Sequence, residues 1–106
     1  MIIYNVTIKV HERIVDEWLQ WMKDEHMPEL LQTGLFTGYR LSRLLEQDET
    51  EGPTYTAQYF CKTLKEYNTY ISEHAPLMRE KGFKKFGDRF IAFRTVMETE
   101  FDSSEK

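Results

Sequence analysis

The chain has few of the residues that cross-link a protein or bind a metal. It contains a single cysteine, Cys61, so an internal disulfide and a CxxC zinc site are both excluded. The three histidines, His11, His26 and His74, show no HxH or HxxxH spacing. There is also no glycine-rich phosphate loop, nucleophile elbow or nucleotide fingerprint. We therefore expect no metal and no cofactor, and we expect Cys61 to be a buried structural thiol.

Long apolar runs and an excess of positive charge are also missing. No stretch approaches the ~20 apolar residues that span a bilayer, and Met1 to Val10 lack the basic start of a signal peptide. The 14 basic residues are outnumbered by 18 acidic ones, for a formal net charge of −4. We therefore expect a cytoplasmic protein that binds neither nucleic acid nor a membrane surface.

The composition is that of one globular domain. The 106 residues are 41% hydrophobic and 14% aromatic, which is enough for a self-sufficient core and argues against disorder. We expect a single domain over residues 1–101, followed by a polar tail over residues 102–106.

Four segments have the pattern of β-strands. Residues 2–10 alternate strictly between apolar and polar side chains. Residues 35–45 and 54–61 are rich in aromatic and β-branched residues, and residues 89–101 form a long fourth segment of this kind. The acidic stretch 46–53 ends in Gly52-Pro53 and is typical of an exposed hairpin loop.

Two segments have helical spacing. The first covers residues 12–25, and Pro28 should end or kink it near His26. Its apolar stripe consists of Ile14, Trp18, Trp21 and Met22. The second covers residues 63–85, begins with a capping box at Thr63 and Glu66, and is interrupted by Pro76.

The order strand, helix, strand, strand, helix, strand predicts an α+β fold of the ferredoxin-like type, with both helices on one face of an antiparallel sheet. The peptide Glu25-His26-Met27-Pro28 recurs as Glu73-His74-Ala75-Pro76, at the same place in each half. This repetition favours a pseudo-symmetric arrangement of the two halves.

The second and fourth strands are apolar on both predicted faces. The fourth alternates Ile91, Phe93 and Met97 with Phe90, Ala92 and Val96, and the second alternates Leu35, Tyr39 and Leu41 with Phe36 and Leu44. Soluble monomers seldom expose a large apolar face, and two-fold self-pairing is the commonest way to cover one. We therefore expect a homodimer whose two sheets enclose a shared cavity. The alternatives are a monomer with a hydrophobic outer face, or burial of that face by the C-terminal segment.

The chain resembles the dimeric α/β-barrel superfamily of ferredoxin-like domains, and within it a family of short bacterial proteins with no assigned function. The resemblance is carried by MIIYNVTIKV, WLQWMKDEHMPELLQTGLF, EHAP and GDRFIAFRTVME, which together span nearly the whole chain. It implies a shared fold, but the superfamily includes monooxygenases, haem-degrading enzymes, lactone isomerases and sensing domains, so it implies no one reaction. Asn5 and His74 lie in elements comparable to those of the haem-degrading members. The third strand lacks their tryptophan, which argues against that activity.

The alternation of the first strand predicts which side chains face the shared cavity. If Tyr4, Val6 and Ile8 face the helices, Asn5, Thr7 and Lys9 face the cavity, although a one-residue slip would reverse each assignment. By the same logic we expect a ligand-binding set on the cavity face, namely Arg40, Gln58, Arg94, Phe60 and Phe90, beside Ser42 and Phe36. Aromatic walls with a few polar groups are typical of small-molecule sites, and two arginines suit an anion. Alternatively, Arg40 and Arg94 pair with Glu98 or other acids and only hold strands together.

His26, His74 and Asn5 are the candidate catalytic residues. Imidazole titrates near neutral pH, which suits acid–base work. Alternatively, each of the two histidines bonds carbonyls that are freed where its helix is interrupted. His11 ends a strand and should be on the surface.

These features predict a small-molecule-binding protein or a cofactor-independent enzyme, monooxygenase- or isomerase-like, with its site in the dimeric barrel. The alternative is a non-catalytic module for metabolite sensing or assembly. The first hypothesis predicts an enclosed pocket near Asn5, His26, Gln58 and Arg94, and the second predicts a packed interior.

Overall fold

The computed structural model describes residues 1–104. Its elements follow the chain as β1 (Ile2–Val10), the 3₁₀ turn η1 (Glu12–Ile14), α1 (Val15–Trp21), the π-helix η2 (Met22–His26), α2 (Met27–Gln32), β2 (Gly38–Arg43), β3 (Thr54–Cys61), α3 (Leu64–Glu73), α4 (Ala75–Phe86) and β4 (Phe90–Glu98). The strands form one antiparallel sheet in the order β2-β3-β1-β4. The predicted ferredoxin-like α+β fold is therefore confirmed.

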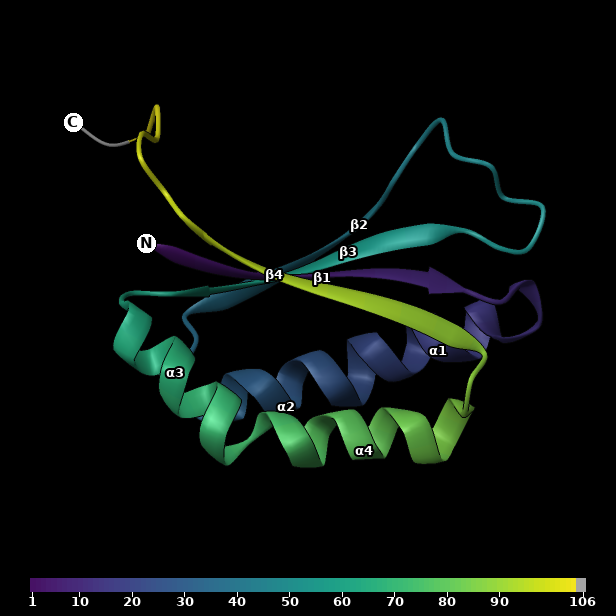
Figure 1. The fold of residues 1–106 in the computed structure, drawn as a ribbon, viewed down its shortest axis with the longest axis horizontal. Helices are drawn as coiled ribbons and strands as arrows, with labels where there is room; N and C mark the ends of the chain where they lie inside the picture. The colour runs from purple at the N-terminus through teal and green to yellow at the C-terminus, as the bar shows by residue number, and fades with distance from the viewer. Residues whose placement is uncertain (105–106) are drawn as a thin grey trace.

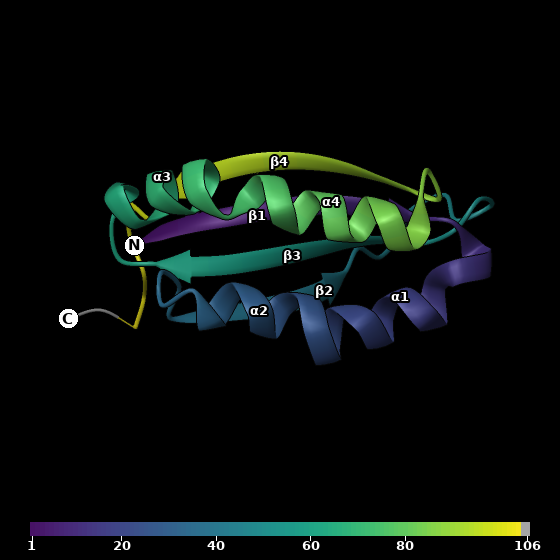
Figure 2. The ribbon, with the colours of Figure 1, turned by 90° about the horizontal axis from the view of Figure 1, so that it is seen from below.

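All the helices cover the same face of the sheet (Figure 1). Seen from the helical side, α1 and α2 form one row across the sheet, and α3 and α4 form a second row beside it (Figure 2). The β2–β3 loop and the segment after β4 rise from the other side of the sheet. None of the helices within residues 1–104 is long and apolar enough to cross a membrane.

The even-numbered residues of β1 face the helices, as the alternation predicts. Tyr4, Ile8 and Val10 are buried there, together with Tyr59 and Tyr55, which pair with Tyr4 and Ile8 on β3. Tyr4 lies at the centre of an aromatic cluster, with ring centroids 5.8 Å from Tyr59 and 5.6 Å from Tyr70. Such pairs contribute about 0.5–1.5 kcal/mol each beyond the burial of their area.

The predicted apolar stripe of the first helix is also confirmed. Ile14, Trp18, Trp21 and Met22 are all buried against the sheet. Cys61 is fully buried at the end of β3, and burial raises the pKa of its thiol. At the start of α3 the Thr63 hydroxyl donates to the Glu66 carboxylate, but the Thr63 side chain caps no backbone N–H, so the predicted capping box is not formed in full.

The two proline motifs interrupt their helices in different ways. Pro28 has no N–H to bond the carbonyl of Asp24, and its ring would crowd that carbonyl in an α-helix. The chain widens here into the π-helix η2, in which the Met27 N–H bonds the Met22 carbonyl, and then continues as α2. At Pro76 the helix breaks instead, because His74 leaves helical geometry (φ −121°, ψ −36°) between α3 and α4.

The face of the sheet opposite the helices, here called the bare face, is formed by alternate residues of the four strands. Its residues are Ile3, Asn5, Thr7, Lys9, Gly38, Arg40, Ser42, Thr54, Thr56, Gln58, Phe60, Ile91, Phe93, Thr95 and Met97. On β4 the prediction of two apolar faces is right, since Ile91 and Phe93 are 58% and 67% exposed.

On β2 that prediction is wrong. The strand begins at Gly38 rather than Leu35, so its bare face carries Arg40 and Ser42. Phe36 lies before the strand and packs on the helical side, 5.0 Å from Tyr70 between ring centroids. Of the predicted tail, residues 102–104 are exposed and residues 105–106 lie outside the described part.

Candidate functional site

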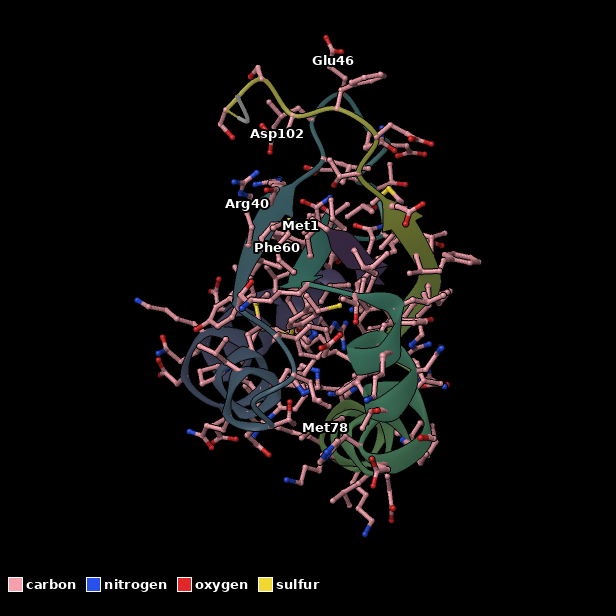
Figure 3. All side chains as sticks on the ribbon, turned by 90° about the vertical axis from the view of Figure 1, so that its left-hand side faces the viewer. Met1, Arg40, Glu46, Phe60, Met78 and Asp102 are labelled. Atoms are coloured by element: carbon pink, nitrogen blue, oxygen red, sulfur yellow. The ribbon has the colours of Figure 1, made fainter. Side chains whose placement is uncertain are left out.

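A cavity of about 60 Å³ lies between the sheet and the two rows of helices. Its floor includes Tyr4, Ala57 and Tyr59, and its walls include Trp21 and Met78. Met78 is labelled in Figure 3, in the helical layer on the far side of the sheet from the bare face. One water molecule needs roughly 10–15 Å³ on this measure. The cavity therefore has room for a small molecule of several atoms.

His26 lies in the wall of this cavity, at the end of the π-helix. Its ring stacks on Trp21 with centroids 4.5 Å apart and planes 19° apart. Its Nδ1 is buried and has no hydrogen-bond partner among residues 1–104. Short π-helical segments occur frequently at functional sites. Here the widened turn accommodates Pro28, and the imidazole ring that carries the unsatisfied nitrogen lines the cavity.

The surroundings of His26 keep its imidazole neutral. Burial lowers its pKa to about 4; Glu29 raises it, and Lys81 and Arg94 lower it further. Glu29 and Lys81 join α2 to α4 by an ion pair of 2.5 Å. At neutral pH the ring therefore offers one hydrogen-bond donor and one acceptor without a charge.

Two arginines line the cavity and are also exposed to solvent, which places them at the cavity opening. Arg79 comes from α4 and Arg94 from β4. Burial raises the pKa of the Tyr70 hydroxyl, and the positive charges of both guanidinium groups oppose this rise. Within residues 1–104, neither arginine forms an ion pair with a carboxylate. The alternative that Arg94 pairs with Glu98 is therefore not what the structure shows.

The predicted orientation of Arg94 and Phe90 is wrong. The register of β4 against β1 sets Arg94 opposite Val6 and Phe90 opposite Val10, whose side chains face the helices. Directly opposed residues of an antiparallel pair project to the same side. Both residues accordingly line the cavity under the helices instead of the bare face.

The catalytic candidate Asn5 and the predicted binding residues Arg40, Gln58 and Phe60 lie on the opposite side of the sheet. The Asn5 amide donates to the hydroxyls of Thr7 and Thr95 at 3.2 and 3.3 Å, and its Oδ1 is buried without a partner among the described residues. The Arg40 guanidinium lies 5.8 Å from the ring centroid of Phe60, and both are labelled in Figure 3. Gln58 pairs with Asn5 in the register of β3 on β1.

His74 belongs to neither group. It lies at the junction of α3 and α4, half-buried, with its ring stacked on Tyr70 at 6.2 Å between centroids. The four residues predicted to share one enclosed pocket, Asn5, His26, Gln58 and Arg94, therefore lie in two separate places. His26 and Arg94 share the cavity, whereas the sheet separates them from Asn5 and Gln58.

Sequence reasoning missed three groups that line the cavity, namely Tyr59, Tyr70 and Arg79. Burial raises the pKa of both tyrosines, so their hydroxyls stay protonated and neutral. The alternation of the third strand could have placed Tyr59 on the helical face. No sequence pattern could have placed Arg79, which depends on how α4 lies across the sheet.

Within residues 1–104, no three His, Cys, Asp or Glu side chains come together in a group that could hold a metal ion. The donors and acceptors of the cavity are instead an imidazole, two guanidinium groups and tyrosine hydroxyls. Such a set binds and orients an organic molecule through hydrogen bonds and charge.

A family profile described as "Domain of unknown function (DUF4286)" matches residues 1–100. The chain belongs to this family. No curated protein matches the DUF4286 chain.

Solved structures with the same fold match the DUF4286 chain over nearly its full length. A Bacillus halodurans protein of the ethyl tert-butyl ether d (ethd) family has a TM-score of 0.64 and 9% identity, over 93% of this chain and 99% of that one. A dimeric ferredoxin-like protein from an uncultured marine organism has a TM-score of 0.60 and 7% identity, over 95% and 96% of the two chains. Hydroxynitrile lyase from Passiflora edulis has a TM-score of 0.56 and 10% identity, over 95% and 97%. At these identities the likeness shows the fold alone.

Proposed function

We propose that this DUF4286 protein binds a small organic molecule in the cavity between its sheet and its helices. The observation that carries the proposal is the buried Nδ1 of His26, which has no partner among residues 1–104 and belongs to a ring in the cavity wall. An unsatisfied buried polar atom costs about 1–3 kcal/mol. A ligand that hydrogen-bonds this nitrogen would recover that free energy on binding.

The cavity favours this function over a purely structural or assembly module. A module of that kind needs only a packed interior, whereas here the helical rows leave a void beside neutral polar groups and two arginines that form no ion pair within residues 1–104. The proposal moves the site from the barrel between two copies, where the sequence suggested it, into the single chain.

A cofactor-independent enzyme is the second candidate. His26 is neutral and adjoins a void, so it could take a proton from a bound substrate. A pKa of about 4 makes it a weak base in the empty cavity, however. Binding is therefore the function that the geometry supports more directly. That one neighbour of this fold is a hydroxynitrile lyase agrees with either role.

We also propose that the protein forms a homodimer through the bare face. Phe93 and Ile91 are more than half exposed there, and the buried Oδ1 of Asn5 has no described partner. The β2–β3 loop and the segment after β4 rise above this face and carry Leu45, 76% exposed, and Phe101, 96% exposed. A second copy seated on the bare face would cover these groups and supply a partner for Asn5.

The binding proposal is tested by titrating the protein with small aromatic probes while following the indole N–H resonances of Trp18 and Trp21, which both line the cavity. We expect at least one of benzamide, phenol and benzoate to shift both resonances saturably. The variant Ala57→Leu, which extends a fully buried floor residue into the void, should abolish the shifts. The proposal fails if no probe shifts these resonances, or if the filled variant binds as well as the original.

A further inference from the structure

We propose that the molecule bound in this cavity is a small planar carboxylate, such as an aromatic acid, held with its carboxylate between Arg79 and Arg94 and its ring against the aromatic wall. This inference rests on the proposed function and adds the chemical class of the ligand.

The charge of the cavity carries the first half of the inference. Of the charged groups nearest His26, Lys81 is already neutralised by Glu29 at 2.5 Å. Arg79 and Arg94 have no ion-pair partner in residues 1–104. Two guanidinium groups on facing elements, α4 and β4, suit a single carboxylate, because guanidinium matches its two oxygens.

The walls carry the second half. The rings of Tyr4, Tyr59, Tyr70, Trp21 and Phe90 all line the cavity. Flat aromatic groups stack on or pack edge-to-face against such rings, and each favourable pair adds about 0.5–1.5 kcal/mol.

The residue at position 82 fits a cavity shaped for a flat group. A Cβ on Gly82 would lie 3.4 Å from Cη2 of Trp21 and 3.6 Å from Cζ of Phe90. With glycine there, α4 lies close over the cavity without filling the space beside these two rings.

His26 supplies the remaining contact. Its ring lines the cavity and its Nδ1 has no partner among the described residues, so this nitrogen can bond a hydroxyl or carbonyl oxygen on the ring of the ligand. We therefore expect a ring with such a substituent to bind more tightly than the plain ring.

Four probes separate the features of this ligand. Benzoate has both the ring and the carboxylate, benzamide has the ring without the charge, acetate has the charge without the ring, and inorganic phosphate is a different anion. By calorimetry we expect benzoate to bind roughly tenfold or more tightly than each of the other three, since hydrogen bonds to charged groups contribute about 1.5–3 kcal/mol. If benzamide binds as tightly as benzoate, this inference is overturned and the proposed function stands. If none of the four probes binds, the inference and the proposed function are both refuted. If acetate or phosphate binds as tightly as benzoate, the ligand class is not an aromatic carboxylate.

Matched arginine variants locate the carboxylate. Arg94→Met and Arg79→Met should each weaken benzoate roughly tenfold and change benzamide less than about twofold. Arg40→Met, on the bare face, should leave both affinities unchanged. If Arg40→Met weakens benzoate and Arg94→Met does not, the anion binds between two copies and this inference is overturned.

Gly82→Ala tests the same geometry with a smaller change than Ala57→Leu, so the test does not depend on whether Ala57→Leu folds. Gly82→Ala adds one methyl group in van der Waals contact with Trp21 and Phe90. We expect it to keep the circular dichroism spectrum and to weaken benzoate several-fold. Unchanged affinity in a folded Gly82→Ala protein would place the ring elsewhere and would refute the geometry proposed here.

Discussion

The buried imidazole of His26 should make this protein less stable in mild acid. Burial lowers the pKa of His26 to about 4, whereas an unfolded chain restores the ordinary value of 6.5. Between these two values the unfolded state binds more protons than the folded state. As far as His26 is concerned, the free energy of unfolding is therefore highest above about pH 6.5, decreases as the pH drops below that value, and stops decreasing below about pH 4.

The size of the effect follows from the difference between the two pKa values. Each pH unit inside the window is worth ~1.4 kcal/mol. Lowering the pH from about 7 to about 5 should therefore reduce the free energy of unfolding by about 2 kcal/mol. The pKa values of the carboxyls of Asp48, Glu66 and Asp102 are lowered by their hydrogen bonds, so their contribution is lost at a lower pH.

The assay is urea denaturation at the two pH values and at a fixed protein concentration, for the original chain and for His26→Gln. Glutamine keeps a polar side chain and removes the titration, so the difference of about 2 kcal/mol between the two pH values should disappear. His11→Gln, at an exposed histidine, should retain it. The reasoning is refuted if His26→Gln loses as much stability in acid as the original chain, or if the imidazole titrates near 6.5 by NMR.

Three further outcomes follow from particular residues. Gly52→Ala should destabilise the protein by more than about 2 kcal/mol, because the φ of Gly52 is +137° and the new Cβ would lie 1.9 Å from a backbone oxygen. Gly34→Ala should cost only about 1–2 kcal/mol, because the φ of Gly34 is +79° and no atom lies within 4 Å of the new Cβ. Equal losses of stability for the two variants in urea denaturation would contradict this difference. Phe93→Asp should convert a dimer to a monomer in sedimentation. The control Phe83→Asp changes a residue of α4 that is 64% exposed, and it should leave the dimer intact. If the two variants sediment alike, the bare face is not the interface. The thiol of Cys61, fully buried and with a raised pKa, should react with a thiol reagent only after denaturant is added, so rapid labelling of the native protein would show that β3 opens there.

Much of the fold could be read from local patterns. The alternation of residues 2–10 assigned both faces of β1 correctly, and the stripe of Ile14, Trp18 and Trp21 identified the buried side of the first helix. Pro28 marked where that helix changes its geometry. These features are determined by neighbours a few residues apart, which one sequence contains.

The candidate site depended on contacts that no local pattern contains. The sequence identified His26 as a candidate, but only the packing of η2 against the sheet shows that its Nδ1 is buried without a hydrogen-bond partner in the described part of the chain. The face of Arg94 was decided by the register of β4 on β1, where a shift of one residue reverses every side chain. Arg79 entered the cavity only because α4 lies across the sheet beside the first helical row.

The sequence by itself determined the order of helices and strands and the apolar side of β1 and of the first helix, because both depend on the spacing of side chains along a helix or a strand. Only the tertiary structure decided that the helical rows stand far enough apart to leave a cavity, and that His26, Arg79 and Arg94 meet around it. These three residues come from η2, α4 and β4, and their distances depend on the packing of whole elements against one another.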